Sequence, residues 1–412
     1  MKKIILTAIL LLSTIIASAY DFVINGIYYN KNGTTATVTY KNNNYNSYSG
    51  DVFIPETVTN GGTTYTVTSI GSSAFYSCTG LTSVTIPKSI TQIGQQAFSD
   101  CSNLDRVYIS DLEAWCNIYF EFNYWGSNPC YYAHHLFLNG IEITHLVIPS
   151  SISYIRAGSF FGCSFLKEIT FPNTVSIIGS NAFGFCSGLT NISIPSSVSD
   201  IYANPFIGCS GIESITIESG NLKYNSNNNC NAIIETSSNK LIAGCKNTII
   251  PSFVTTINNE AFYGLTSLSS VIIPSSVTFI GGAAFDYCDS LMDVYCYNPN
   301  PPETPQYSSV FYYIKANRTL HVPVGSVPKY STDWNWYNYF ESIVEMEPDT
   351  VNHGDVNGDD KINISDVTTL IDFLLSDDDS HINRINSDVN GDSKINISDV
   401  TTLIDMLLRG TY

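Results

Sequence analysis

The chain has 412 residues, of which 36 are acidic and 18 are basic, and its formal net charge at pH 7 is −18. A charge of this sign argues against nucleic acid and anionic membranes as partners. Because only 13% of the residues are charged, we expect outer surfaces made largely of Ser, Thr, Asn and Tyr. Such surfaces recognise other molecules through hydroxyl and amide hydrogen bonds.

Residues 1–19 have the composition of a secretory signal peptide. Two lysines precede an apolar run from Ile4 to Ile16, and Ala-Ser-Ala comes directly before Tyr20. The run is too short to span a bilayer as a permanent helix. We therefore predict cleavage after Ala19 and a secreted protein, extracellular or at the cell surface, that is not inserted in the membrane.

Residues 20–66 contain alternating polar and apolar segments separated by Asn-Gly and Gly-rich turns, which is typical of strands. They lack the repeat that begins next in the chain. We interpret them as an N-terminal cap that covers the open apolar edge of the first repeat.

Residues 67–297 repeat a pattern first seen in Ile70–Pro87. Each copy has an isoleucine anchor, a phenylalanine five residues later, usually a cysteine three further on, then a leucine or isoleucine and a closing run such as SVTIP. Adjoining copies step by 23 residues. A fixed period of this size indicates a solenoid, and the alternation in the closing run predicts one half-buried strand per coil. The anchors are Ile70, Ile93, Ile155, Ile178, Ile201, Ile257 and Ile280; the cysteines are Cys78, Cys101, Cys163, Cys186, Cys209 and Cys288.

Two insertions interrupt the array, one between Ile93 and Ile155 and the other between Ile201 and Ile257. Insertions in repeat arrays usually project from one face and often carry recognition. The alternative, which we favour, is that their aromatic side chains pack back on the solenoid.

Eleven cysteines in an exported chain suggest disulfides. The six in the repeat column are better interpreted as small buried hydrophobic residues. Cys230 and Cys245 bracket a predicted hairpin in the second insertion, where pairing Glu235 with Lys240 would set the two cysteines opposite each other. We predict a Cys230–Cys245 disulfide, with two free thiols as the open alternative. A second pair, Cys116 with Cys130, has less support.

After Tyr297 comes a Pro-rich stretch and then a segment rich in Trp and Tyr. We interpret residues 298–346 as a C-terminal cap and residues 347–353 as a linker. Trp334 and Trp336 are more consistent with closing the end of the solenoid than with stacking on sugar rings.

The last part of the chain, residues 354–412, contains two near-identical copies of a 21-residue segment that begin at Asp355 and Asp388. Oxygen-bearing side chains at positions 1, 3, 5, 9 and 12 of a 12-residue loop are the ligands that Ca²⁺ requires, so we predict two calcium ions. Lys361 and Lys394, at position 7, would contribute only their backbone carbonyls. The side-chain ligands are Asp355, Asn357, Asp359, Asn363 and Asp366 in the first loop, and Asp388, Asn390, Asp392, Asn396 and Asp399 in the second.

A predicted helix follows each loop, but no helix precedes it. Apolar residues at helical spacing form one stripe per helix, and two facing stripes would make a small calcium-dependent core. We expect Ile362 and Ile395 to pair the loops. The stripes are Val367, Leu370, Ile371, Leu374 and Leu375, and Val400, Leu403, Ile404, Leu407 and Leu408.

Residues 50–345 resemble the BspA-like leucine-rich-repeat family of bacterial surface proteins. The resemblance rests on the AF..C..L..V.IP pattern, the AWC…SNP…AHH insertion and the CNAII…GC hairpin. It implies a surface or secreted protein, and several members are implicated in adhesion to host proteins or other cells.

The tail resembles a type I dockerin over Gly354–Leu408. This resemblance implies a module that folds with calcium and docks on a cohesin of a scaffold or surface protein. One departure from the dockerin pattern is that Asp360 and Ser393 replace the glycine expected at position 6, and glycine falls at position 4 instead, as Gly358 and Gly391. Aspartate in place of glutamate at position 12 separates the loops from a calmodulin-type pair. The alternatives are an acidic tail without metal and a calcium-binding tail without a cohesin.

Together these features predict a mainly β leucine-rich-repeat solenoid with a small all-α dockerin domain at the C-terminus. We expect cohesin contacts from the helix starts, and the near-identity of the copies predicts two interchangeable binding modes. The candidates are Ile364, Ser365, Thr368 and Thr369, and their equivalents Ile397, Ser398, Thr401 and Thr402.

We expect no enzymatic activity, because the sequence has no phosphate-binding glycine loop, nucleophile elbow or helical zinc motif. The leading hypothesis is a secreted protein whose solenoid binds an extracellular protein or glycan, such as a host protein. The alternatives are a passive spacer in a surface assembly and a component of a polysaccharide-degrading complex. The outward strand positions that would form the recognition surface are Arg106, Tyr108, Glu168, Thr170, Asn191, Ser193, Asp293 and Tyr295.

Overall fold

The structure is a computed structural model that describes residues 19–41, 45–121, 124–305, 309–311, 318–346, 354–359, 361–376, 382–390 and 394–409. The predicted signal peptide, apart from Ala19, lies outside the described residues. The predicted linker at 347–353 and the candidate ligand Asp392 also lie outside them. Within the described ranges, no helix is long and apolar enough to cross a membrane.

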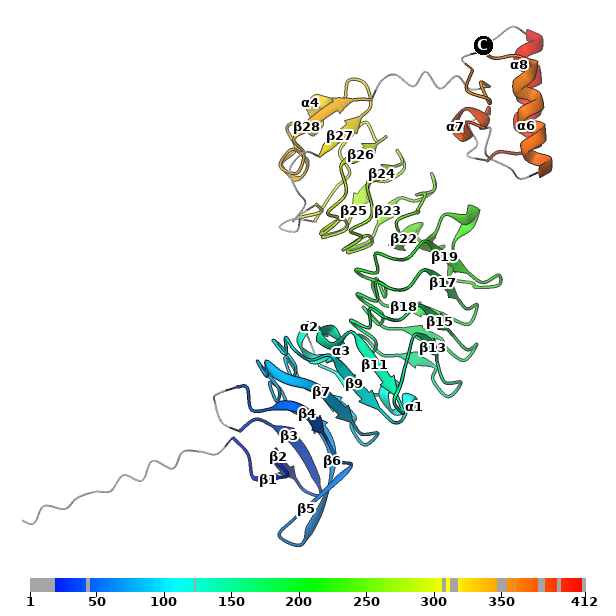
Figure 1. Ribbon diagram of the computed structural model, residues 1–412. Coiled ribbons are helices and arrows are strands. Elements are labelled where there is room, and N and C mark those ends of the chain that lie inside the picture. The colour runs from blue at the N-terminus through cyan, green and yellow to red at the C-terminus, as the bar shows by residue number, and fades with distance from the viewer. Residues whose placement is uncertain are drawn as a thin grey trace, which may run out of the picture.

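Each coil of the array contributes one strand to a row of parallel strands, the strand ladder, and stacking of the coils builds an elongated solenoid (Figure 1). Adjacent coils pair with the 23-residue step of the sequence, so that Val84 lies opposite Val107. The predicted mainly β solenoid, followed by a small helical domain, is confirmed. The ladder strands are β4 (Ser49–Phe53), β7 (Gly80–Ile86), β9 (Arg106–Ile109), β11 (His135–Leu138), β13 (His145–Val147), β15 (Glu168–Thr170), β17 (Asn191–Ile194), β19 (Ser214–Ile217), β24 (Ser270–Ile273), β26 (Asp293–Cys296), β27 (Thr319–Val322) and β28 (Ser342–Glu345). Hydrogen bonding divides them into four sheets: β4 to β11, β13 with β15, β17 with β19, and β24 to β28.

A second set of short parallel strands contains the anchor isoleucines. Ile178, for example, pairs with Ile201 of the next coil. These strands are β8 (Gln92–Ile93), β14 (Tyr154–Ile155), β16 (Ile177–Ile178), β18 (Asp200–Ile201), β23 (Thr256–Ile257) and β25 (Phe279–Ile280). Strand β10 (Tyr119–Phe120) belongs to the same set and places Phe120 opposite the anchor Ile93.

The N-terminal segment starts with an antiparallel meander, and its third strand pairs in parallel with the strand that carries the first anchor, Ile70. Its apolar residues are therefore continuous with the core of the first coil. The strands are β1 (Phe22–Ile24), β2 (Ile27–Asn32), β3 (Thr35–Thr39), β5 (Thr57–Asn60) and β6 (Thr63–Ile70).

The core of the solenoid consists of columns of identical residues. Phe183 is fully buried between the parallel rings of Phe160 and Phe206, with centroids 5.5 and 5.7 Å away. Each stacked coil also places its cysteine beside the preceding phenylalanine, and the Cys209 thiol donates a hydrogen bond to the Phe183 carbonyl oxygen. The column cysteines are free and buried, which confirms that interpretation. The same thiol bond recurs at Cys101, Cys186 and Cys288.

The first insertion forms an irregular coil inside the array. Strand β10 pairs with β8, and β11 pairs with β9. The Cys130 thiol lies beside Cys163, so Cys130 extends the cysteine column. Trp115 is buried and its indole N–H donates to the Ser159 carbonyl oxygen at 3.0 Å, so packing back on the solenoid is confirmed here. The other elements of the insertion are α1 (Leu112–Cys116), α2 (Tyr124–Ser127), α3 (Cys130–Ala133) and β12 (Ile141–Glu142).

The second insertion places a buried hairpin between two parts of the core. Ile233 and Ile242 pack against the N-terminal part, whereas Ile234 and Leu241 pack against the C-terminal part. Each strand therefore buries both of its faces. The elements are β20 (Tyr224–Asn225), the 3₁₀ helix η1 (Asn227–Asn229), β21 (Ala232–Glu235) and β22 (Lys240–Gly244).

The predicted Cys230–Cys245 disulfide is wrong in this structure, where both thiols are free. Glu235 does pair with Lys240, but a β-bulge at Ile233/Ile234 shifts the register beyond it. A shift of one residue turns a side chain to the opposite face. Accordingly Cys230 packs in the C-terminal core and Cys245 in the N-terminal core. Cys116 and Cys130 are free as well.

The coil geometry continues beyond Tyr297, where we predicted that repeats cease. Phe311 stacks on Phe285 at 5.2 Å and so extends the phenylalanine column. Trp336 is fully buried and donates to the Pro302 carbonyl oxygen, so it does close this part of the core, whereas Trp334 is exposed. The helices here are α4 (Val327–Tyr330) and α5 (Trp334–Tyr337).

The C-terminal domain consists of two long helices that pack against each other and one short helix (Figure 1). Its separate apolar core includes Val367, Leu370, Val400 and Leu403, as the stripes predicted. The helices are α6 (Ile364–Ser376), α7 (Arg384–Ser387) and α8 (Ile397–Arg409).

Candidate functional sites: the calcium loops and the solenoid surface

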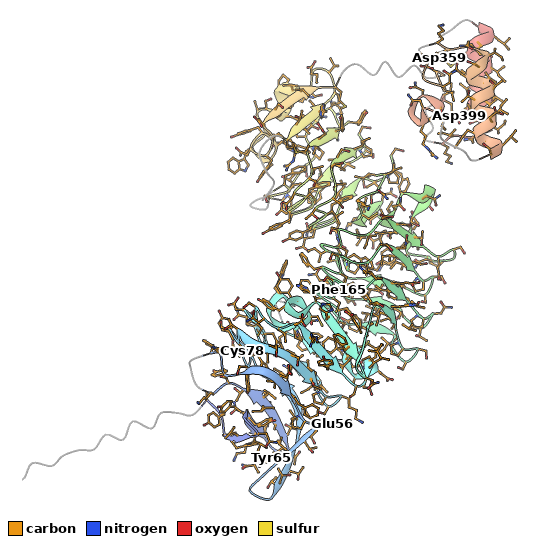
Figure 2. The ribbon with its side chains drawn as sticks, viewed as in Figure 1. Glu56, Tyr65, Cys78, Phe165, Asp359 and Asp399 are labelled. Carbon is orange, nitrogen blue, oxygen red and sulfur yellow. The ribbon has the colours of Figure 1, made fainter. Side chains whose placement is uncertain are left out.

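The first candidate calcium loop folds around its own carboxylates. The Asp355 carboxylate accepts a hydrogen bond from the backbone N–H of Asp359, and Asp359 accepts one from the N–H of Lys361. Asp366, at position 12, accepts one from the N–H of Asn357 at 3.2 Å. These bonds draw positions 1, 3, 5 and 12 into one compact turn. Asp359 lies in this domain, as does Asp399 of the second copy (Figure 2).

Positions 9 and 12 also start the helix. The Asn363 side-chain oxygen accepts from the N–H of Ser365, and the Asp366 carboxylate accepts from the N–H of Asn363, both at 2.8 Å. Asn363 therefore caps the helix through the residue at N2, and the Asp366 bond back to Asn363 is one half of a capping box. The carboxylate at position 12 thus reaches back to the residue before the helix. Loop and helix are thus stabilised by the same two side chains.

The described residues of the second loop repeat the contacts of positions 3, 9 and 12. Asp399 accepts from the N–H groups of Asn390 and Asn396, and Asn396 accepts from the N–H of Ser398. The Asn390 side-chain amide donates to the Ser398 hydroxyl, as that of Asn357 does in the first copy. At positions 3, 9, 11 and 12, which the structure describes in both loops, the near-identity of the copies is therefore matched by the same bonding.

The buried carboxylates fit a divalent cation. Asp366 and Asp399 are both fully buried, and no ion pair among the described residues includes either of them. A buried carboxylate is costly unless it is paired or coordinates a metal. No three acidic, His or Cys side chains converge on one point within the described ranges. The predicted donor set of each loop also includes asparagine oxygens and one backbone carbonyl.

The two loops are tied together through backbone and side-chain contacts that sequence analysis missed. The side-chain amide of Asn386, on α7, donates to the Asp355 carbonyl oxygen at 2.9 Å. The backbone carbonyl of Asn386 accepts a hydrogen bond from the N–H of Gly354. Gly354 has φ +110° and lies against Ile362 and Leu403, so a Cβ there would clash. Ile362 and Ile395 both pack against the domain core.

The ends of the predicted apolar stripes do not enter the core. Leu375 and Leu408 are each 81% exposed, whereas Phe373 is buried and lies under the Arg384 guanidinium. A straight stripe drifts around the helix over two turns, which carries its last member away from the partner helix. The apolar stripe pattern predicted that both leucines are buried, whereas both are equally exposed in the structure.

The candidate cohesin-binding residues lie at the helix starts. Ile364 and Ile397 are 70% and 68% exposed. Leu375 follows Ile364 by eleven residues, roughly three helical turns, so the two share one side of α6. Thr368 and Thr401 are exposed on the same helices, while Ser365, Thr369, Ser398 and Thr402 are half-buried. The hydroxyls of Thr368 and Thr369 donate to the Ser365 carbonyl oxygen, and those of Thr401 and Thr402 to that of Ser398.

The outward strand positions of the solenoid fall into separate groups. Glu168, Asn191 and Ser193 line a hollow of about 490 Å³ over β15, β17 and β19. Asp293 and Tyr295, on β26, contact His321 instead. The remaining positions also have neighbours: Arg106 pairs with Asp105, Tyr108 packs on Phe137, and Thr170 bonds to His145.

Comparisons with known families agree with these two parts. The BspA type leucine-rich repeat region matches residues 44–123, 133–241 and 239–324 in six copies, and the dockerin type I domain matches residues 353–408. The repeat matches cover more than half of the chain. The chain therefore belongs to the BspA-type leucine-rich-repeat family and carries a type I dockerin domain. Both domains are of typically non-catalytic kinds; type I dockerins generally bind calcium, and a dockerin implies a cohesin partner.

No protein with a curated description matches the chain. Among solved structures, it is similar to a leucine-rich cell surface protein from Faecalibacterium prausnitzii A2-165, with 23% identity, 79% of this chain and 94% of the other covered, and a TM-score of 0.45. It is also similar to the pneumococcal vaccine antigen PcpA, with 17% identity, 80% and 99% coverage and a TM-score of 0.37. A leucine-rich-repeat protein from Bacteroides ovatus has 21% identity, 80% and 100% coverage and a TM-score of 0.27.

Proposed function

We propose that the protein is a secreted or cell-surface binding protein with two working parts. The solenoid recognises an extracellular protein or glycan, and the dockerin domain holds two calcium ions and docks on a cohesin. The observation that supports this most is the duplicated loop-and-helix unit, which has the same capping bonds, the same buried carboxylate and the same exposed apolar residues in both copies.

Each loop would hold one calcium ion through the oxygens proposed above, with Lys361 and Lys394 contributing their backbone carbonyls. Calcium supplies the positive charge that the buried Asp366 and Asp399 carboxylates need. Calorimetric titration of the full chain tests this. Two sites are expected, accompanied by a gain of helix in far-UV circular dichroism, and a chain that binds no calcium contradicts the proposal.

The docking surface is present twice. Ile364 with Leu375 on α6 and Ile397 with Leu408 on α8 are equivalent exposed pairs. A half-turn of the domain would present either helix to the same cohesin, which gives the two interchangeable binding modes. Binding of the full chain to a panel of cohesins tests this, with calcium present throughout.

The variants for this test change one helix or both. We expect Ile364→Ala/Leu375→Ala and Ile397→Ala/Leu408→Ala each to retain binding, and the fourfold variant to lose it. Loss of binding in one of the double variants alone would contradict the two modes.

The recognition role of the solenoid is tested with a chain that ends at residue 346. We expect it to capture extracellular glycoproteins or polysaccharides as the full chain does. A truncated chain that captures neither would favour the alternative of a passive spacer whose dockerin is its only binding element. Hydrolysis of a captured polysaccharide would favour a component of a degrading complex.

A further inference from the structure

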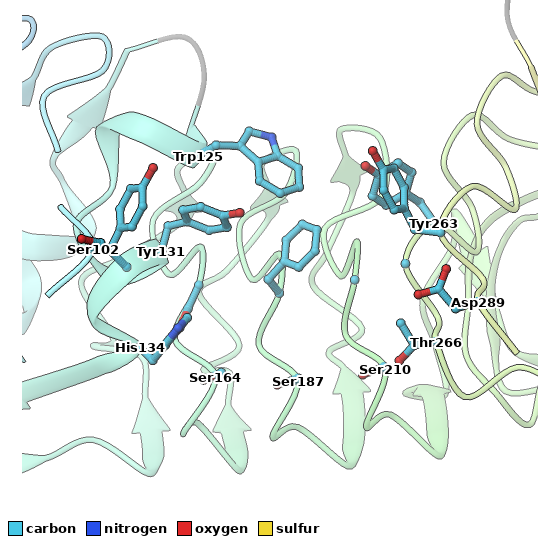
Figure 3. A pocket seen from close by; sticks show the side chains of 16 residues that line it. Ser102, Trp125, Tyr131, His134, Ser164, Ser187, Ser210, Tyr263, Thr266 and Asp289 are labelled. Atoms are coloured by element: carbon cyan, nitrogen blue, oxygen red, sulfur yellow. The ribbon is translucent and has the colours of Figure 1, made fainter. Parts of the chain in front are cut away.

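A groove of about 930 Å³ runs along the solenoid where each coil turns from its phenylalanine column into its ladder strand (Figure 3). The first insertion contributes Trp125, Tyr131, Tyr132 and His134 to it, and the regular coils contribute the rest. It is separate from the hollow on the strand ladder. None of the outward strand positions lines it.

The groove is continuous although the sequence is interrupted twice beside it. The Gly208 N–H donates to the Tyr263 carbonyl oxygen at 2.8 Å, so the coils on either side of the second insertion stack directly. Gly264 lies so close that its Cβ would stand 2.9 Å from the Gly208 Cα. The first insertion packs equally closely on the coil that follows it, where Gly162 lies against the Tyr131 backbone.

Aromatic rings form a row along this groove. Trp125 packs on Tyr131 at 5.2 Å and on Phe185 at 4.6 Å. Phe185 contacts Tyr263 at 6.5 Å, and Tyr263 contacts Tyr287 at 5.0 Å. The rings come from the insertion and from three different coils, and they cover one wall of the groove.

Two of these rings occupy backbone positions that disfavour them. The residue before each column cysteine has a positive φ, and three of the coils have glycine there. Phe185 and Tyr287 have φ of 58° and 57°, a conformation that is unfavourable for a bulky side chain. Strain of this kind points to a role for the side chain itself. The residues of this column are Ser77, Asp100, Gly162, Phe185, Gly208, Gly264 and Tyr287.

A row of hydroxyl groups faces the rings. The residue after each column cysteine is small and polar. Successive members of this row lie one coil apart, and stacked strands are separated by about 4.8 Å. Within the described part of the chain, the Ser164, Ser187, Ser210 and Thr266 hydroxyls make no side-chain hydrogen bond. Figure 3 shows them aligned from coil to coil. They are available as donors and acceptors for a ligand.

The charge of the lining also limits the ligand. Asp289 is the one residue of the Asp, Glu, Lys and Arg types among the described lining residues. A groove with so little charge suits an uncharged ligand. Sugar rings have apolar C–H faces that pack on aromatic rings, and hydroxyls around their edges that pair with serine and threonine.

We propose that this groove binds an extended, uncharged polysaccharide, with its sugar faces on the aromatic row and its hydroxyls on the serine row. The advance of one coil is comparable to the length of one sugar unit, so successive sugars meet equivalent positions. This inference rests on the recognition role proposed for the solenoid, and it names both the ligand class and the place of binding.

The test measures binding of the full chain to linear β-glucan, xylan and mannan by calorimetry. Tyr287→Gly removes one ring at a position where other coils already have glycine, so the unfolding midpoint should stay equal or rise. Affinity for the bound polysaccharide should fall on the order of tenfold. Ser187→Arg fills the groove from an exposed position and should weaken binding further.

Asn173→Ala changes an exposed position that lines neither the groove nor the hollow on the strand ladder. It is the matched control and should leave affinity unchanged. The proposal is overturned if none of the three polysaccharides binds, or if both groove variants bind as well as the unchanged chain. Capture of a polypeptide that the groove variants abolish would also overturn it, while the recognition role of the solenoid would stand. Cohesin binding, measured in the same variants, reports on the docking role separately.

Discussion

Replacing Phe183 by alanine should strongly destabilise the solenoid. The ring is fully buried, lies between two parallel rings and meets Phe171 edge-on at 5.7 Å. Truncation of a buried phenylalanine costs about 3–5 kcal/mol, because apolar transfer energy is lost and a cavity remains. Stacking adds about 0.5–1.5 kcal/mol per aromatic pair. We therefore expect Phe183→Ala to lie at the upper end of this range.

Two further variants separate the causes. Phe183→Leu keeps most of the apolar volume and loses the ring contacts, so its cost should be about 1–2 kcal/mol. Phe165→Ala removes a phenylalanine that is 44% exposed and stacks on His135. Its effect should stay below about 1 kcal/mol.

Guanidinium unfolding of the three variants and the unchanged chain gives the comparison, with the slope of each transition checked before free energies are compared. In a stacked array each coil contacts only its neighbours, so fluorescence and circular dichroism should be followed together. A Phe183→Ala cost below about 1 kcal/mol, or one equal to that of Phe165→Ala, would refute the column as a source of stability.

Other predictions concern the loops and the thiols. Asp366→Asn and Asp399→Asn should each remove one calcium site in calorimetric titration, since each replaces a buried carboxylate; two sites remaining in the double variant would contradict the ligand assignment. Reductant should leave the mass and the unfolding midpoint unchanged, because Cys230 and Cys245 are free. A midpoint that falls on reduction would instead support a Cys230–Cys245 disulfide. Burial raises the pKa of Cys209 from 9.0 to about 12. The folded state then holds its proton more tightly, so its contribution to stability is complete below pH 9 and is lost as pH rises towards 12. Urea midpoints at several pH values should fall over this window, and by less in Cys209→Ala; an equal fall would assign the effect to other groups.

Local pattern was enough to predict the solenoid and the calcium loops. A residue repeated every 23 positions must stack on its equivalent once the coils align, so the buried phenylalanine and cysteine columns follow from spacing. The Asp355 and Asp388 loops could be proposed as calcium sites because their candidate ligands are close in sequence. The capping bonds of Asn363 and Asp366 act over three residues and have the same local origin.

The tertiary structure decided three features: the register of the hairpin, which part of each apolar stripe is covered, and which distant segments are in contact. One bulge at Ile233/Ile234 turned Cys230 away from Cys245, and no residue in the hairpin announces that shift. Leu375 and Leu408 became exposed because the partner helix covers only part of each stripe. The groove brings Trp125 of the first insertion against Phe185, and it brings Phe185 against Tyr263 across the second insertion. Their proximity is fixed by how the coils close over the inserted segments, a contact between parts of the chain that no local spacing encodes.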